Sequence, residues 1–281
     1  MVVNRKKGIG EMRGLLQKIR LEVQWPVAWF SLGLMLVMGL LTALLPKVLG
    51  NIHEVFNKMP LVKPLITALL GVDPGDQISS GLSQAFLWTH PTLLSLIWAH
   101  ELMYCSRLPA AEVDRGTADF LLCLPVSRWK IFLAETVGWL VSGAIILCGG
   151  LVGHLIASSF VHPEMRLSQT DAFRVLINLA ALYLAVGGFA FLISAFSDRR
   201  GRAIGIVFAL LLLSFLLNFL AQFQDWAKSI AWLSVMEYYR PAIIIRSGEF
   251  PADDVKMLLL LTGVFWSVSL AVLRRRSICT V

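Results

Sequence analysis

Long apolar stretches alternate with short polar segments along the whole chain. Six stretches lack Asp, Glu, Lys and Arg, and each comes close to or exceeds the about 20 residues that cross a hydrocarbon core. The spans built on them are expected at about residues 26–46, 82–104, 131–158, 174–196, 203–223 and 256–273. The pattern therefore predicts an all-α integral membrane protein with six transmembrane helices and a single transmembrane domain over residues 1–281.

The composition supports a membrane rather than an aqueous environment. Of the 281 residues, 57% are hydrophobic and 15% are charged, whereas soluble domains carry about 25% charged residues. This excludes both a soluble globular domain and a disordered chain. The four cysteines, Cys105, Cys123, Cys148 and Cys279, form no C-x-x-C pair, which argues against a disulfide framework or a metal site.

The positions of the basic residues predict the orientation. Most of the 25 Lys and Arg residues lie before span one, between spans two and three, between spans four and five, and after span six. Positively charged loops stay in the cytoplasm, so we expect a multi-pass protein of the plasma membrane with both termini cytoplasmic. The net charge of +7 then reflects topology and membrane lipid, and no nucleic-acid partner is expected.

Two kinds of segment are expected outside the hydrocarbon core. Residues 1–25 read as a cytoplasmic amphipathic helix, because Met12, Leu16 and Ile19 recur at helical spacing between charged residues. It would lie along the headgroups, with Pro26 in the first turn of span one; the alternative is a solvated basic tail. Before span six, the segment 225–256 is expected to form short exterior interfacial or re-entrant helices.

The cytoplasmic loop 105–130 carries the most specific pattern. Gly116 permits a turn, and Thr117 is placed to cap a short helix that Pro125 ends. Ser127 would cap the third span. The short helix would present a cluster of apolar side chains, namely Phe120, Leu121, Leu122 and Leu124. These side chains either bind a partner protein or sink into the membrane interface.

The loop resembles that of the membrane subunits of the ABC type-2 permease family. The matching residues are Glu112, Gly116, Thr117, Leu121, Leu122, Pro125, Ser127 and Arg128. The basic start, the six spans and the basic end Arg274–Arg276 follow in the family's order. One position departs from the pattern, because similar sequences often carry lysine where this chain has Glu135.

The resemblance implies an ABC exporter in which this chain is a permease and not an enzyme. Two six-span subunits, identical or paralogous, would work with two copies of a separate ATP-binding subunit. The chain lacks a G-x-x-x-x-G-K-[ST] motif, so it binds no cofactor and its partner would use the ATP and Mg. That partner would dock on loop 112–128, a short coupling helix, through Glu112, Gly116, Thr117, Phe120, Leu121, Leu122, Pro125, Ser127 and Arg128. The cargo is expected to be lipid-like, a drug or a peptide.

Polar residues within the spans are functional candidates. We expect His100, Glu101, Glu135 and Asp198 to form ion pairs rather than to handle protons, and His154 to be a hydrated residue near the outer surface. Asn178 and Asn218 would hydrogen-bond between helices or line a substrate path. Gly149–Gly150 and Gly187–Gly188 would allow close helix packing. The alternatives that remain open are an intramembrane enzyme using Glu101 and His100, a channel without ATP drive, and a membrane scaffold.

Overall fold

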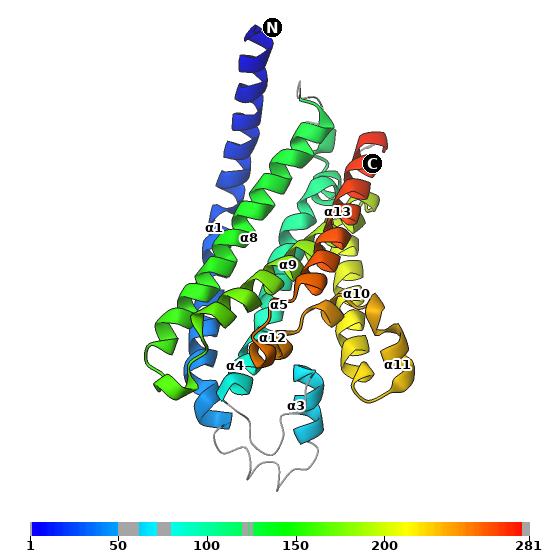
Figure 1. The fold of residues 1–281 in the computed structure, drawn as a ribbon. Helices are drawn as coiled ribbons and strands as arrows, with labels where there is room; N and C mark the ends of the chain where they lie inside the picture. Colours follow the sequence, from blue (N-terminus) through cyan, green and yellow to red (C-terminus); the bar gives the residue numbers. More distant parts are fainter. Residues whose placement is uncertain (1, 50–61, 72–79, 120–122, 124–125, 277–281) are drawn as a thin grey trace.

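The computed structural model describes residues 2–49, 62–71, 80–119, 123 and 126–276, and every regular element in this part of the chain is helical. Five of the described helices are long and apolar enough to cross a membrane. They are α1 (Val2–Leu49), α8 (Arg128–Ser158), α9 (Gln169–Phe196), α10 (Arg200–Ala221) and α13 (Ala252–Arg275). Figure 1 shows them as an elongated bundle with both chain termini at the same end. We call this end, which also holds residues 106–119, the loop end.

The structure divides the second expected span, 82–104, into two helices. α4 (Ser80–Thr89) ends before His90, and α5 (Pro91–Cys105) begins directly after it. Pro91 lacks a backbone N–H and its ring disfavours helical geometry in the residue before it. The Nδ1 atom of His90 accepts a hydrogen bond from the backbone N–H of Thr92 at 3.3 Å, as a capping residue does. α4 and α5 therefore follow one another as two separate helices, and their crossing of the membrane remains a prediction.

The N-terminal segment differs from the expected separate helix. It continues into the first span as the 48-residue helix α1, which runs through Pro26 and extends beyond the other helices at the loop end (Figure 1). Leu15, Ile19, Val23 and Val27 are all buried. Their spacing of four residues carries one apolar face from the N-terminal segment into the span. Because this face packs along α8, the segment stays in line with the span.

Small residues let the long helices approach closely. α1 lies along α8 and α9 lies along α13. A Cβ atom added at Gly153 of α8 would lie 2.1 Å from the carbonyl oxygen of Met35 in α1, and one added at Gly149 would lie 2.3 Å from the hydroxyl of Ser31. One at Gly187 of α9 would lie 2.3 Å from the Trp139 ring. The close packing expected at Gly149 and Gly187 is confirmed.

Shorter helices lie between the long ones. Near the loop end are η1 (Arg107–Ala111) and α6 (Glu112–Asp114), and α3 (Val62–Leu70) lies at the opposite end (Figure 1). η2 (Pro163–Met165) precedes α9. Four more follow α10, where short helices were expected: α11 (Asp225–Ile230), η3 (Ala231–Leu233), η4 (Val235–Tyr238) and α12 (Pro241–Ser247). Their interfacial or re-entrant position remains a prediction.

Candidate coupling site

The Glu-x-x-x-Gly-Thr part of the loop pattern forms a closed turn after α6. Gly116 has φ +68°, in the left-handed region that favours glycine. This turn brings Thr117 back toward Glu112, whose carboxylate accepts a hydrogen bond from the Thr117 hydroxyl at 2.5 Å and whose carbonyl accepts one from the Thr117 N–H at 3.0 Å. The Thr117 side chain therefore closes the turn behind it, and its expected capping of the helix ahead remains a prediction.

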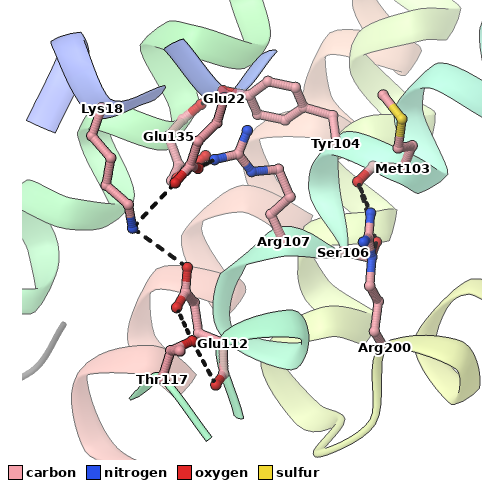
Figure 2. Close-up of polar contacts among 10 residues, drawn as sticks. All are labelled: Lys18, Glu22, Met103, Tyr104, Ser106, Arg107, Glu112, Thr117, Glu135 and Arg200. Atoms are coloured by element: carbon pink, nitrogen blue, oxygen red, sulfur yellow. Dashed lines mark hydrogen bonds and ion pairs between the residues drawn. The ribbon is translucent and has the colours of Figure 1, made fainter. Parts of the chain in front are cut away.

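Glu112 connects this turn to α1. Its carboxylate lies 3.5 Å from the ammonium of Lys18, which also lies 3.8 Å from Glu22 on the same helix (Figure 2). The Glu112 side chain is 17% exposed. The Lys18 side chain is 44% exposed, so the pair fixes the position of the turn beside α1 and contributes little to stability by itself.

Arg107 joins the same network from the start of η1. Its guanidinium donates to the Glu22 carboxylate and lies 3.7 Å from the Glu135 carboxylate on α8. The Tyr104 hydroxyl donates to the backbone carbonyl of Glu135 at 3.3 Å. Figure 2 shows these groups converging between α1, α8 and the loop. The expected ion pairing of Glu135 is confirmed, because its carboxylate lies beside the Arg107 guanidinium.

The loop is also fixed to the start of α10. The guanidinium of Arg200 donates to the Ser106 hydroxyl at 3.1 Å and to the Met103 carbonyl at 2.8 Å (Figure 2), and its backbone N–H donates to the Asp114 carboxylate at 3.3 Å. Ser194 of α9 donates to the Leu108 carbonyl at 3.0 Å. The loop thus contacts two further long helices.

The far end of the loop is tied to the C-terminal end of α13. Arg128 donates to the carbonyls of Leu273 at 3.3 Å and Arg276 at 2.5 Å. Arg276 in turn donates to the Ala195 carbonyl at 2.6 Å and pairs with Asp198, which confirms the ion pair expected for Asp198. Ser127 occupies the N-cap position of α8, although its side chain makes no capping hydrogen bond.

The apolar part of the loop falls mostly outside the described residues. Those left out are Phe120, Leu121, Leu122, Leu124 and Pro125. Ala118 and Asp119 are helical, and the Ala118 side chain is buried. The apolar cluster and its role in binding a partner therefore remain predictions.

Asn178 and Asn218 both bind the segment before α13. The Asn178 amide donates to the Tyr238 carbonyl at 2.9 Å and accepts from the Arg240 N–H at 3.2 Å. The Asn218 amide donates to the Glu237 carboxylate at 2.9 Å. The structure thus joins α9 and α10 to η4 through these two residues, and a role in a substrate path remains a prediction.

Two expectations about buried polar residues are wrong. His154 is not hydrated: it is 1% exposed, and its Nδ1 atom lies 2.9 Å from the Thr42 hydroxyl of α1, beside Trp88. His100 and Glu101 are fully buried, and neither has an ion-pair partner among the described residues; the Nδ1 atom of His100 lies 3.4 Å from the Tyr183 hydroxyl. All three residues lie where helix faces pack together, and charge patterns along the chain do not reveal this packing. In the described part of the chain, no three His, Cys, Asp or Glu side chains gather in a way that could hold a metal ion.

A family model described as ABC-2 family transporter protein matches residues 102–272. The match begins at the last turn of α5 and runs through the loop to α13, so it includes the closed turn and most of its partners. The chain belongs to the ABC-2 transporter family. Neither a comparison with curated proteins nor one with solved structures gives a match.

Membership places the chain among the membrane components of ABC transporters. It is thus a multi-pass membrane protein and a permease, in agreement with its several apolar helices. Members of this family normally work with an ATP-binding subunit.

Proposed function

We propose that this ABC-2 permease is an exporter subunit whose motion is driven by a separate ATP-binding subunit docked on loop 112–128. The observation that carries the proposal is the network around the closed turn. Lys18 joins the loop to α1, Arg107 joins it to α8, and Arg200 joins it to α10. A partner that moved this loop would therefore move three of the long helices.

The driving step is a change between two arrangements of the bundle, biased by the partner. ATP and Mg bind to the ATP-binding subunit, and closure of its two copies pulls the loops of two permease subunits. A loop held by ion pairs and hydrogen bonds shifts as a body with the helices it contacts, because packed interfaces switch between discrete arrangements. The second permease is another copy of this chain or a related paralogue.

Six crossings with both termini in the cytoplasm are part of the proposal. The two termini lie at the same end of the bundle (Figure 1). Five crossings would leave them on opposite sides, so a sixth is needed, and α4 with α5 supplies it as a broken span. Broken spans are tolerated in membranes where neighbouring helices cover the freed backbone groups.

An apolar cavity supports a lipid-like, drug or peptide cargo. It has a volume of about 380 Å³ and lies between α9, α10, η4 and α13. Its lining includes Phe189, Leu213 and Phe265. Such a lining favours an apolar or amphipathic cargo over a bare ion, which would need charged or carbonyl ligands.

The docking claim is tested by isolating the tagged permease from its native membranes and labelling bound proteins with a photoreactive ATP analogue. The wild-type chain should retain a labelled ATP-binding subunit. Replacing Leu121 and Leu122 together by Glu should abolish this association. Replacing Leu259 and Leu260 by Ala, an exposed pair on α13 outside the cavity lining, provides the control and should retain it.

Recovery of the labelled subunit by the Leu121→Glu/Leu122→Glu variant at the wild-type level contradicts docking on this loop. Size-exclusion chromatography verifies that the variant is folded. If it is not, the single variant Leu121→Ser is measured in the same way.

A further inference from the structure

An apolar groove runs along α1 and α8 on the surface of the bundle. Its volume is about 550 Å³. The apolar lining includes Leu16, Val23 and Ala28 of α1 and Val137, Val141 and Ile145 of α8. Val141 is 54% exposed and Ile145 is 48% exposed, so the groove opens to the surroundings of the bundle rather than to its core.

The groove can hold part of one lipid chain. At 1.5 Å per residue, the stretch of α1 from Leu16 to Ala28 extends about 18 Å. Half of a hydrocarbon core is about 15 Å thick. Lys18 and Glu22 lie in the first half of this stretch, where the charged network with Arg107 marks the boundary of the apolar region, and about 9 Å, from Glu22 to Ala28, lies beyond it. It therefore reaches from this boundary into one leaflet.

The polar groups at the mouth favour an anionic ligand. Arg20 and Gln24 lie four residues apart on α1, so they share one face, and both are exposed and line the groove. The neighbouring cation Lys18 is paired with Glu22 and Glu112. The described residues provide no acidic partner for Arg20. Ser142, also in the lining, already donates to the Trp139 carbonyl.

We infer that this groove binds one anionic phospholipid from the leaflet at the loop end. Its phosphate contacts Arg20 and Gln24, and one acyl chain lies between Val23 and Val141. Arg and phosphate form strong charge-assisted hydrogen bonds, and anionic lipids concentrate on the cytoplasmic face. A second copy of the chain fits less well, because covering the groove would bury Arg20 without an acidic partner. The site rests on the proposed orientation, with the loop end in the cytoplasm, and the lipid is a resident ligand rather than cargo.

The test is photocrosslinking of the full-length chain in vesicles of phosphatidylcholine. The probe is phosphatidylglycerol with a diazirine near the middle of one acyl chain, and the comparison lipid is phosphatidylcholine with the same diazirine. Labelled peptides are mapped by mass spectrometry. We expect phosphatidylglycerol to label residues 137–145 about tenfold more than phosphatidylcholine, the effect of one or two charge-assisted hydrogen bonds.

Variants separate the headgroup contact from the chain contact. Arg20→Ala should lower phosphatidylglycerol labelling to the phosphatidylcholine level. Arg13→Ala is the matched control. Arg13 is exposed, lies about 10 Å before Arg20 along the same helix and does not line the groove, so labelling should not change. Ala28→Trp should block labelling by both lipids, because the indole fills the path of the chain.

Two results would overturn the inference. Equal labelling by the two lipids, unchanged in Arg20→Ala, would show ordinary lipid contact without recognition of the headgroup. Absence of groove labelling, together with a disulfide between Val141→Cys copies, would show that a second chain covers the groove. If Arg20→Ala is not folded, labelling by the two lipids is compared on the wild-type chain and on Gln24→Leu instead.

Discussion

The closest approach between α1 and α8 gives the sharpest test of the fold. A Cβ atom at Gly153 would lie 2.1 Å from the Met35 carbonyl oxygen and 2.8 Å from the Met35 carbonyl carbon. Both distances are well inside the 3.4 Å at which ordinary contact begins. The atoms met are backbone, so a rotamer change gives no relief. Gly153→Ala must therefore push α1 away from α8.

The cost is that of overpacking a closely packed interface, about 1–3 kcal/mol. For a chain of this size, 1 kcal/mol corresponds to roughly 2–4 °C in melting temperature. We expect Gly153→Ala to melt several degrees below wild type, as measured by size-exclusion chromatography of heated, detergent-solubilised protein.

Gly33→Ala is the matched control. Gly33 lies on α1 in the same part of the bundle, and a Cβ atom there would meet nothing within 4 Å. Alanine at an open helix position is favoured over glycine by roughly 0.5–1 kcal/mol, so Gly33→Ala should melt at or slightly above the wild-type temperature. If Gly153→Ala melts together with Gly33→Ala, the described contact between α1 and α8 is wrong.

Three further changes test the polar network. Thr117→Val removes the hydroxyl that is hydrogen-bonded to Glu112, at a cost of about 1–3 kcal/mol, and should lower transport. Thr117→Ser keeps the hydroxyl and should keep transport, so equal transport by the two variants contradicts a role for this hydrogen bond. Arg107→Gln leaves Glu135 without its cation and should lower the free energy of unfolding by roughly 3 kcal/mol. In a double-mutant cycle, adding Glu135→Gln should recover part of that loss, whereas additive losses would rule out coupling between the two residues. Asn218→Leu should cost about 1 kcal/mol, seen as a lower melting temperature, and an unchanged temperature contradicts the hydrogen bond to η4.

The sequence predicts the class of the protein because its strongest signals are local. Charge-free stretches long enough to cross a membrane identify the apolar helices, and the short pattern from Glu112 to Arg128 identifies the family. The interruption at His90 was also visible, since a proline disfavours helix in the residue before it. A span predicted only from the absence of charged residues takes no account of this proline, so the second span was expected to be one continuous helix.

Contacts between distant segments could not be predicted. Lys18 and Glu112 are separated by 94 positions, and only the packing of α1 beside the loop brings them together. His154 was expected in water because it follows many apolar residues near the end of a span, yet α1 covers it with Thr42. The continuation of α1 through Pro26 likewise depends on α8, which receives the same apolar face on both sides of the proline.

The central claim, that an ATP-binding subunit docks on loop 112–128, is tested most directly from a residue that the chain already provides. Cys123 is exposed and free within this loop. In a variant with Cys105, Cys148 and Cys279 replaced by Ala, a short thiol-to-amine crosslinker in native membranes should join Cys123 to the ATP-binding subunit, and Cys123→Ala should lose the product. Labelling of Cys123 by an impermeant thiol reagent added outside intact cells, with no crosslink to a nucleotide-binding protein, would contradict the account.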